Sequence, residues 1–348
     1  MRETLLSGED CAAHEGQDHG GDLAAAARLF PRAPRPWLDL STGINPFAYP
    51  YTPLAPEIFT RLPETCTALE ATAWQAYATP PYAGIVAAPG SQALIQALPR
   101  LWAARGRPLP RVGILGPTYT EHAANWRSIG APVEEVRDFA ALDAMDVAVI
   151  VNPNNPDGRL IAADALCALA ARLALRNGLL IVDEAFMDLE RSEAHLVPQL
   201  PRAGVIVLRS FGKTYGLGGL RLGFAITEPG LAEDLRSWFG AWAVSGPAIA
   251  IGRQALGDVA WRERTGRRLT AQIAVLDGFL KGAGFTICGG TRLFRLTSHA
   301  QAEVWFQRLG EAGIYVRRFA NAPNWLRFGI PGDDRSLMRL GDIFAKGL

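Results

Sequence analysis

The chemistry that this sequence can carry centres on a lysine placed among glycines. Lys213 lies in the segment 210–223, which reads Ser-Phe-Gly-Lys-Thr-Tyr-Gly-Leu-Gly-Gly-Leu-Arg-Leu-Gly and follows an apolar run. Glycines let the backbone approach a ligand closely, and Ser210 and Arg221 are residue types that bind phosphate. A lysine near cations and in apolar surroundings has a lowered pKa, which Schiff-base chemistry requires. The segment therefore predicts an amine nucleophile beside a bound anion.

A carboxylate and an amide follow two other apolar runs. Asp183 comes directly after the run 179–182, and a carboxylate at the end of a buried strand is costly unless it has a partner. A cationic or hydrogen-bonding partner is one interpretation, and a role in capping a helix is the other. Asn155 lies in the turn 152–158, whose two prolines and final glycine favour a sharp reversal. Its amide either bonds within the turn or donates to an oxygen of a ligand.

A further segment has the composition of a phosphate cradle. Gly90-Ser91-Gln92 stands between an apolar run and a helical pattern. A glycine before a helix N-terminus exposes unpaired N–H groups and a positive potential to an anion. The alternative is an ordinary strand-to-helix turn in which Ser91 caps the helix. Tyr119, in Gly-Pro-Thr-Tyr after another apolar run, is either a buried tyrosine at a strand end or a residue that packs on a ligand.

These segments follow short apolar runs that are typical of strands. The runs are rich in Val and Ile and are continuous rather than alternating, which indicates strands buried on both faces of a mostly parallel sheet. Stretches such as 93–104 and 164–177 predict helices between them. Because ligands bind at the carboxyl edge of such sheets, we expect the polar segments to meet there. The runs span residues 84–88, 112–115, 147–151, 179–182, 205–208 and 222–226.

The pattern changes along the chain and predicts more than one domain, since 348 residues exceed one average domain. We expect residues 1–40 to form an N-terminal arm that is part of the small domain, with Asp22 capping a short helix. Residues 41–244 are expected to form the large, ligand-binding domain. Residues 245–348 are expected to form a small α+β domain that begins with one long helical segment over 248–281.

Composition argues against several classes of protein. The formal net charge is +1 and no run of Lys and Arg occurs, so we expect no nucleic-acid partner. The four cysteines are scattered without metal-ligand spacing, so we expect free thiols and no metal site. The N-terminus lacks the apolar region of a signal peptide, and no apolar run is long enough to cross a membrane. These features predict a soluble, cytoplasmic protein with no membrane partner.

Together, the order and spacing of these segments resemble the fold-type I enzymes of pyridoxal 5′-phosphate (PLP), in the class I/II aminotransferase family. The resemblance implies an α/β fold: a mostly parallel, seven-stranded-type sheet sandwiched by helices, with a smaller α+β domain. It implies that Lys213 holds PLP as a Schiff base, that Asp183 pairs with the pyridinium nitrogen, and that Asn155 holds the ring hydroxyl. Tyr119 would stack on the ring as a further catalytic residue. The residues implied around the cofactor phosphate are Gly90, Ser91, Gln92, Ser210 and Arg221.

Within this family the chain is similar to the decarboxylases of L-threonine O-3-phosphate in cobalamin biosynthesis. The similarity lies in His19-Gly20-Gly21-Asp22, in the segment 38–46, and in Phe186, where histidinol-phosphate aminotransferases have tyrosine. It implies a phosphorylated amino acid as substrate, with Arg327 gripping the α-carboxylate in a bidentate pair. The residues expected to bind substrate are His19, Gly43, Asn45, Arg159 and Arg327, with Ser41 as a further candidate.

Two alternatives stay open at this point. A histidinol-phosphate aminotransferase or related aminotransferase has the same cofactor motifs, because the orientation of the substrate decides which of its bonds breaks. A non-catalytic PLP-binding protein is the other alternative, but it would not need Lys213, Asp183 and Arg327 together. The family also implies a homodimer. Leu62 stands where many relatives have a tyrosine that reaches the neighbouring subunit's cofactor phosphate, so this contact would be missing or replaced.

Overall fold

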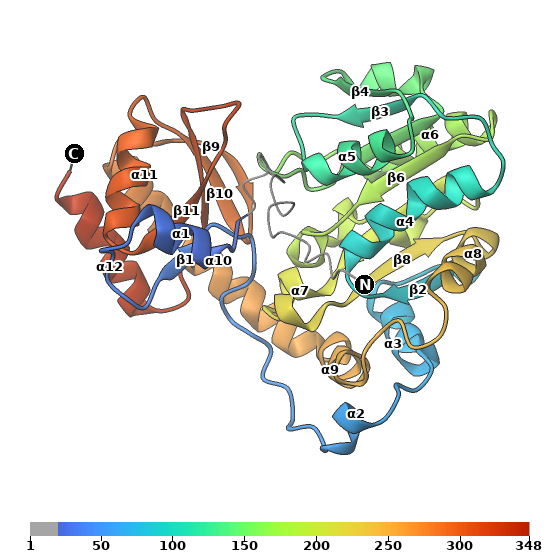
Figure 1. Cartoon of the computed structure of the whole chain (residues 1–348), viewed down its shortest axis with the longest axis horizontal. Coiled ribbons are helices and arrows are strands. Elements are labelled where there is room, and N and C mark those ends of the chain that lie inside the picture. Colours follow the sequence, from blue (N-terminus) through green and yellow to red (C-terminus); the bar gives the residue numbers. More distant parts are fainter. Residues whose placement is uncertain (1–19, 348) are drawn as a thin grey trace, which may run out of the picture.

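The computed structural model describes residues 20–347, which form two β-sheets with helices packed around them (Figure 1). The larger sheet has seven strands in the order β2-β8-β7-β6-β5-β3-β4. Strands β4, β3, β5, β6 and β7 run parallel, whereas β8 is antiparallel to both β7 and β2. The mostly parallel α/β fold is therefore confirmed. The bounds are β2 Gly84–Ala88, β3 Val112–Leu115, β4 Val133–Val136, β5 Val147–Val151, β6 Leu179–Asp183, β7 Val205–Ser210 and β8 Gly223–Thr227.

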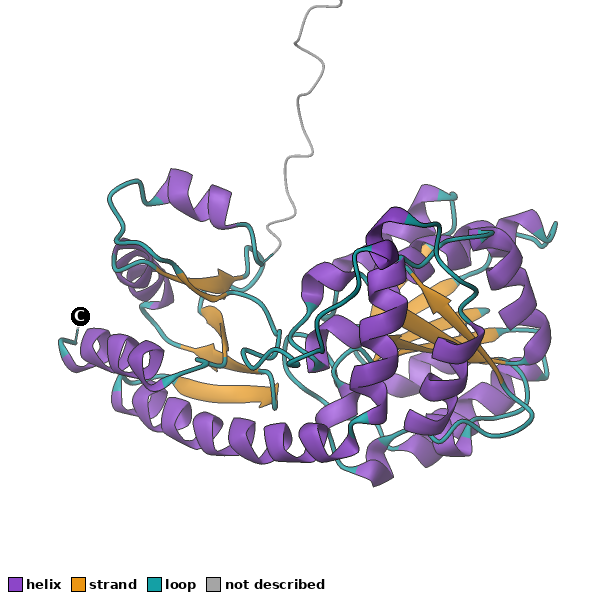
Figure 2. Cartoon of the chain, turned by 90° about the horizontal axis from the view of Figure 1, so that it is seen from below, coloured by secondary structure: helices purple, strands orange, loops and turns teal. Residues whose placement is uncertain are grey.

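Both faces of the large sheet are buried, which explains why its strands are continuous apolar runs. Within β5, Val147 and Val149 pack in one hydrophobic cluster, whereas Ala148 and Ile150 pack in another on the opposite face. Helices α4, α5 and α8 contribute to the first cluster, and α3, α6 and α9 contribute to the second. Helices accordingly lie on both faces of the large sheet (Figure 2). The bounds are α2 Glu57–Thr60, α3 Thr67–Ala76, α4 Ser91–Ala104, α5 Thr120–Ser128, α6 Ala163–Ala174, α7 Phe211–Thr214, α8 Pro229–Phe239 and α9 Gly246–Gly257.

The second sheet has five strands in the order β1-β11-β12-β10-β9, and only β1 and β11 pair in parallel. The N-terminal α1 and β1 join this sheet and its hydrophobic cluster (Figure 1). Asp22 accepts a hydrogen bond from the backbone N–H of Ala25 and so caps α1, as predicted. The bounds are α1 Leu23–Leu29, β1 Leu38–Leu40, α10 Val259–Gly282, β9 Thr286–Thr291, β10 Phe294–Ser298, α11 Ala302–Glu311, β11 Ile314–Arg318, β12 Trp325–Gly329 and α12 Asp334–Ala345.

Two elements differ from the sequence-based expectation. The segment 248–281, expected as one helical stretch, is divided between α9 and α10. Asp258 ends α9 and begins α10, since its carboxylate accepts the backbone N–H of Trp261 at 2.9 Å. Strand β4 was not predicted, because it lies at an edge of the sheet with Glu134 and Glu135 exposed. An edge strand with solvent-facing charges lacks the apolar pattern of the central strands.

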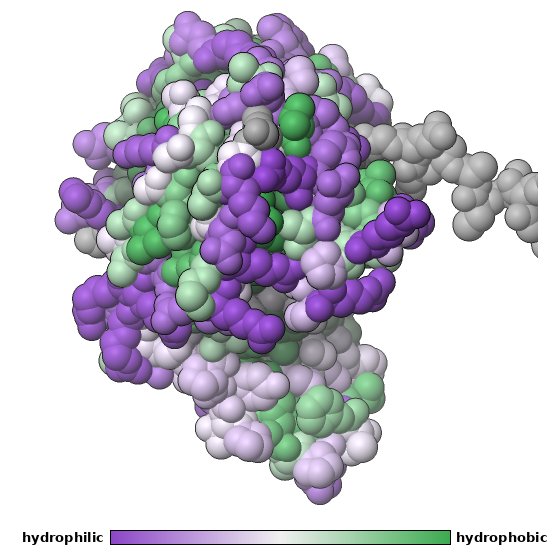
Figure 3. Space-filling view, turned by 90° about the vertical axis from the view of Figure 1, so that its left-hand side faces the viewer, coloured by the Kyte–Doolittle hydropathy of each residue, from purple (hydrophilic) through white to green (hydrophobic). Residues whose placement is uncertain are grey.

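No helix within residues 20–347 is long and apolar enough to cross a membrane. Cys66, Cys167 and Cys288 are free thiols. In the same part of the chain, no group of three or more His, Cys, Asp or Glu side chains is arranged to hold a metal ion. At the end of the molecule formed by the smaller sheet, hydrophilic and apolar residues are interspersed (Figure 3).

A buried cluster of charges links the turn after β6 to β7. Arg209 on β7 is 0% exposed; its Nη2 lies 2.6 Å from Glu184 Oε2, and its Nη1 donates to Asp188 Oδ1 at 2.6 Å. The centroid of the Tyr77 ring lies 4.9 Å from the guanidinium carbon of Arg209. Burial raises the pKa of Glu184, and the neighbouring Arg209 only partly opposes that shift. Loss of one partner would leave the others charged and buried without compensation.

We therefore expect Arg209→Met to lower the free energy of unfolding by about 3–5 kcal/mol. The matched control is Arg172→Met, because Arg172 forms an ion pair with Asp143 whose side chains are 47% and 42% exposed. An exposed pair contributes at most about 1 kcal/mol. Urea denaturation followed by circular dichroism, at one protein concentration for all variants, measures the difference. Equal losses in the two variants would contradict a stabilising role for the buried cluster.

Candidate active site

The polar segments predicted from the sequence meet at the carboxyl edge of the large sheet. Strand β2 leads to Gly90, β3 leads to Tyr119, and β5 leads to the turn that contains Asn155. Strand β6 ends at Asp183, and β7 leads into the one-turn helix that carries Lys213. Because β2 and the central strands point the same way, their ends lie at the same edge. This edge is where open α/β sheets bind ligands.

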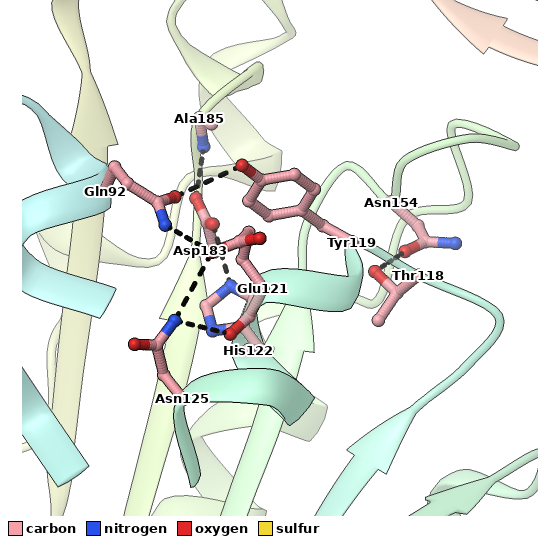
Figure 4. Close-up of polar contacts among 9 residues, drawn as sticks. All are labelled: Gln92, Thr118, Tyr119, Glu121, His122, Asn125, Asn154, Asp183 and Ala185. Atoms are coloured by element: carbon pink, nitrogen blue, oxygen red, sulfur yellow. Dashed lines mark hydrogen bonds and ion pairs between the residues drawn. The ribbon is translucent and has the colours of Figure 1, made fainter. Parts of the chain in front are cut away.

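Asp183 has a buried histidine as its partner. The carboxylate is 3% exposed, and its Oδ2 lies 3.0 Å from His122 Nε2 on α5 (Figure 4). Its Oδ1 accepts the backbone N–H of Ala185 at 3.1 Å. With a proton on Nε2, the imidazole donates to the carboxylate and fixes its orientation. Sequence reasoning foresaw a hydrogen-bonding partner for Asp183 but did not identify His122, because only the path of α5 brings the two together.

Tyr119 and Gln92 belong to one chain of hydrogen bonds (Figure 4). The Tyr119 hydroxyl donates to Gln92 Oε1 at 3.2 Å, and Gln92 Nε2 donates to Glu121 Oε2 at 2.7 Å. Asn125 Nδ2 donates to the backbone carbonyl of Glu121 at 2.9 Å. Burial raises the pKa of Tyr119 to about 12, and the carboxylates of Glu121 and Asp183 add to the shift. The tyrosine therefore stays protonated at neutral pH, and its ring is held at the same edge as Asp183.

Lys213 lies on α7, directly after β7, and is half-buried. Burial is the main reason that its pKa falls to about 8; Arg327 and Arg221 lower the pKa further, whereas Asp183 opposes them. The Nζ atom lies 5.6 Å from the ring centroid of Phe186. A lysine with a pKa near 8 has an appreciable neutral fraction at neutral pH and can act as a nucleophile.

Asn45 supports the helix that carries Lys213. Its Nδ2 donates to the carbonyl of Thr214 at 2.7 Å, its backbone N–H donates to the carbonyl of Lys213 at 2.9 Å, and its Oδ1 accepts the N–H of Phe47. Both ends of this side chain are therefore engaged with the backbone. Asn45 therefore positions the helix that carries Lys213, and its contact with substrate stays a prediction.

Gly90 and Arg221 frame the N-terminus of α4. Gly90 has a φ of +86°, and a Cβ there would lie 2.7 Å from Arg221 Nη2. A Cβ on Gly223 would lie 2.5 Å from the backbone N of Ser91. Glycine at position 90 admits the Arg221 guanidinium, and glycine at position 223 lets β8 pass close to the first turn of α4. Unpaired N–H groups beside a guanidinium suit a phosphate group. Ser210, another residue predicted to contact phosphate, immediately precedes α7.

Arg327 reaches the site from the smaller sheet. Its Nη1 donates to Asn155 Oδ1 at 2.5 Å, and its Nη2 donates to the carbonyl of Ser41 at 2.8 Å. Burial lowers the pKa of Arg327 to about 9, and the charge of Arg317 lowers it further. Arg317 on β11 is directly opposite Arg327 on β12. Two arginines therefore stand side by side where the smaller sheet meets the turn that contains Asn155. Sequence reasoning missed Arg317, because strand register alone brings it to Arg327.

The other predicted substrate residues are placed as follows. Ser41 donates from Oγ to Asp39, and Gly43 lies against aromatic side chains beside Lys213. The guanidinium of Arg159 donates to the carbonyls that end β3, at 3.4 and 3.5 Å. His19 lies outside the described residues. Gly43, Asn45 and Arg327 lie beside Lys213 or Asn155, and a contact of any residue of this set with substrate stays a prediction.

Comparison with known proteins identifies relatives over nearly the whole chain. The model of the aminotransferase class I and II family matches residues 61–341. A relative from Sinorhizobium sp., named threonine-phosphate decarboxylase, is 42% identical over 342 residues, which cover 94% of this chain and 97% of that protein. A relative of the same name from Pseudomonas aeruginosa is 40% identical over 326 residues, covering 93% and 96%.

The fold is also that of solved structures. The crystal structure of histidinol-phosphate aminotransferase from Sinorhizobium meliloti, in complex with pyridoxal 5′-phosphate, superposes with a TM-score of 0.78. The match covers 96% of this chain and 100% of that chain at 17% identity. At this identity the likeness concerns the fold alone.

The lowered pKa of Lys213 can be tested by chemical labelling of the cofactor-free protein. Because the amine is protonated below its pKa and reactive above it, we expect acylation of Lys213 to rise through a midpoint near pH 8. Peptide mass spectrometry quantifies each lysine, and Lys281 and Lys346 are internal references. A midpoint at the ordinary lysine value, roughly 10.4, would show that burial does not tune this amine.

Proposed function

The chain belongs to the aminotransferase class I and II family, and we propose that it decarboxylates L-threonine O-3-phosphate with PLP bound to Lys213. The observation that carries this proposal is the similarity to two threonine-phosphate decarboxylases over more than nine-tenths of the chain. The family model, which matches residues 61–341, includes the strands with Arg317 and Arg327. The product would be (R)-1-aminopropan-2-yl phosphate, an intermediate for cobalamin biosynthesis, and the expected location is the cytoplasm.

The residues at the carboxyl edge fit PLP. The cradle formed by Gly90, Ser91 and Arg221 has the charge and the exposed N–H groups for the cofactor phosphate. Asp183, fixed by His122, would face the ring nitrogen and hold a proton there. Tyr119, held by Gln92, would lie against the ring face. Asn155 would hold the ring hydroxyl, and Ser210 would complete the phosphate contacts.

When bound, PLP supplies an electron sink for the pair that remains on Cα after the carboxylate leaves. The chain's own residues must bind and orient the substrate and manage its proton. Lys213 Nζ, released from the cofactor by the incoming substrate amine, would carry the proton that Cα finally receives. Arg327 would hold the carboxylate perpendicular to the ring without gripping it so tightly that the ground state is favoured over the transition state.

The pair of arginines on β11 and β12 suits a substrate with two anionic groups. A threonine phosphate has a carboxylate at Cα and a phosphate on its side chain, so Arg327 would hold the first and Arg317 the second. The phosphate does not react, but its binding can orient the carboxylate, which is the group that leaves. Histidinol phosphate, the substrate of the alternative aminotransferase, has no carboxylate for Arg327.

We expect Arg317→Met to raise the KM for L-threonine O-3-phosphate by about 10- to 150-fold, the equivalent of a charged hydrogen bond of about 1.5–3 kcal/mol. Free threonine should be a poor substrate of both proteins. The matched control is Arg318→Met, the next residue on β11, whose guanidinium lies 3.8 Å from Glu303 and is 40% exposed. Carbon dioxide release and PLP affinity are measured for each.

Two results would overturn the assignment. Equal turnover of threonine and threonine phosphate by the wild-type protein would contradict the proposed second anion site. Efficient conversion of histidinol phosphate with 2-oxoglutarate, without carbon dioxide release from threonine phosphate, would favour the aminotransferase instead.

We also propose that the chain acts as a homodimer. Large apolar side chains are exposed around α2 and the start of α9: Phe59 is 66% exposed, Leu62 69% and Trp242 62%. These segments adjoin each other, because a Cβ on Gly246 would lie 2.6 Å from the carbonyl of Ile58. A hollow of about 460 Å³ runs between Pro63 and Trp242. Apolar patches of this kind are typical of interfaces.

In sedimentation velocity the wild-type protein should therefore be a dimer, and Leu62→Asp combined with Trp242→Asp should shift it towards monomer. Leu175→Asp is the control, because Leu175 is 87% exposed at the end of α6 and lies outside the proposed patch. A wild-type monomer with full activity would contradict the proposal.

A further inference from the structure

A polar cavity of about 300 Å³ lies between the large sheet's side of the molecule and the start of α10. Its wall comes from the end of α3, the turn after β6, strand β7, the first turns of α10 and the turn between β9 and β10. None of the residues that line it belongs to the set predicted to bind the cofactor or the substrate. We call it the α10 cavity, and its volume suits a small metabolite.

Two arginines without carboxylate partners line the α10 cavity. Arg262 lies on α10, and Arg292 lies in the turn between β9 and β10. A Cβ on Gly266 would lie 3.1 Å from Arg292 Nη1, and Gly266 follows Arg262 by one helical turn, so the two guanidinium groups share one face of α10. Within residues 20–347, no carboxylate oxygen lies within 4.0 Å of either guanidinium. The Tyr215 hydroxyl lies near Arg262, but burial raises its pKa and keeps it uncharged.

Buried polar atoms without partners belong to other residues that line the cavity. Tyr77 is 4% exposed, and its hydroxyl has no hydrogen-bond partner within the part of the chain that the structure describes. The same holds for Oδ2 of Asp188, whose side chain is 4% exposed and whose Oδ1 accepts from Arg209. Burial raises the pKa of Tyr77, so its hydroxyl stays protonated and can donate. Buried polar groups in native proteins nearly always have partners, so these atoms indicate hydrogen bonds to an occupant.

The other titratable groups of the cavity limit the charge that an occupant can carry. Glu190 uses Oε1 to accept the backbone N–H of Arg292 at 3.3 Å, and Glu263 is exposed to solvent. Burial and the charge of Arg209 lower the pKa of His195 to about 4, so this ring is neutral at neutral pH. Two unpaired guanidinium groups therefore face acidic side chains across the cavity, which suits an occupant with one anionic group and a hydrogen-bond donor.

We propose that the α10 cavity binds a small organic anion that also carries a hydroxyl group. The anionic group, a carboxylate or a phosphate, would lie between Arg262 and Arg292 in charge-assisted hydrogen bonds. The hydroxyl group of the ligand would donate to Asp188 Oδ2, and the Tyr77 hydroxyl would donate to the ligand. This inference does not depend on the proposed decarboxylation, because it involves other residues.

Such a ligand would join parts of the molecule that otherwise meet only at a few contacts. Helix α10 runs from the side of the large sheet to the smaller sheet (Figure 1), and Arg262 and Asp188 lie on opposite walls of the cavity. A ligand held by both walls ties α10 to the turn after β6. Because it binds the folded chain and not the unfolded one, it should raise the melting temperature in proportion to occupancy.

The test is calorimetric titration of the PLP-loaded protein with glycerol 3-phosphate and, separately, with propyl phosphate, which lacks the hydroxyl groups. Neither probe has an amine that could react with the cofactor. We expect glycerol 3-phosphate to bind with a Kd at least about fivefold lower than that of propyl phosphate, because a hydrogen bond to a charged group is lost in the second probe. Arg262→Met should raise the Kd of glycerol 3-phosphate by at least about tenfold.

A second variant, Gly266→Ala, separates binding from folding. Its methyl group would displace the Arg292 guanidinium from α10, so the Kd of glycerol 3-phosphate should rise several-fold. Alanine favours a helix over glycine, so the free energy of unfolding should not fall in this variant. The matched control is Arg268→Met on the same helix, because Arg268 is exposed and its guanidinium carbon lies 3.5 Å from the ring centroid of Phe47, outside the cavity. It should keep the wild-type Kd.

The same titrations in an Arg317→Met background distinguish the cavity from the proposed substrate site, which also accepts phosphate. Binding that survives Arg317→Met but is lost in Arg262→Met supports the proposal. Binding that is lost in Arg317→Met and kept in Arg262→Met and Gly266→Ala would place the probe at the substrate site and refute it. Equal affinities for the two probes would overturn the contact with Asp188 and thus the class of ligand. No binding of glycerol 3-phosphate to the wild-type protein, by calorimetry and by thermal shift, would overturn the site itself.

Discussion

Positive charge is concentrated and buried at this site, and the arrangement depends on how that charge is balanced. Lys213 and Arg327 have pKa values lowered to about 8 and about 9, chiefly because burial removes water from them. Asp183 opposes the shift at Lys213, but it is bonded to His122 and Ala185. Cations buried in this way are costly until anions join them. The phosphate of the cofactor and the anionic groups of the substrate provide those anions, so their binding energy becomes available to orient the reacting bond.

The same constraint explains why the site is assembled from both sheets. The large sheet supplies Lys213 and Asn155, and the smaller sheet supplies Arg327, whose guanidinium donates to Asn155 Oδ1. The backbones on either side of this bond are in close contact. A Cβ on Gly158, in the asparagine turn, or on Gly289, in β9, would collide with the backbone of the other segment. Glycine thus allows the edge of the smaller sheet to reach the turn that carries Asn155.

Sequence reasoning predicted the parts of the site that depend on local pattern. The apolar runs fix the strands, and the end of each strand fixes where Lys213 and Asp183 must lie, because parallel strands share an edge. It could not identify His122 or Arg317, since each is defined by a partner distant in the sequence. Arg317 lies opposite Arg327 through the register of β11 and β12, and a shift of one residue would send it to the other face. Strand β4 was not predicted for a related reason: it has exposed glutamates, and an edge strand needs no apolar pattern.

The turn after β6 shows how catalytic and stabilising residues can share one short segment. Asp183 and Phe186 face the site, whereas Glu184 and Asp188 pair with Arg209 on β7. Arg209 lies four residues before Lys213, so the ion-pair cluster fixes the end of β6 against the strand that delivers the lysine. The positions of Asp183 and Phe186 relative to Lys213 are therefore held by charges outside the site. The buried cations of the site destabilise the fold. The ion pairs of Arg209 with Glu184 and Asp188 stabilise the turn after β6 and so keep the site in place.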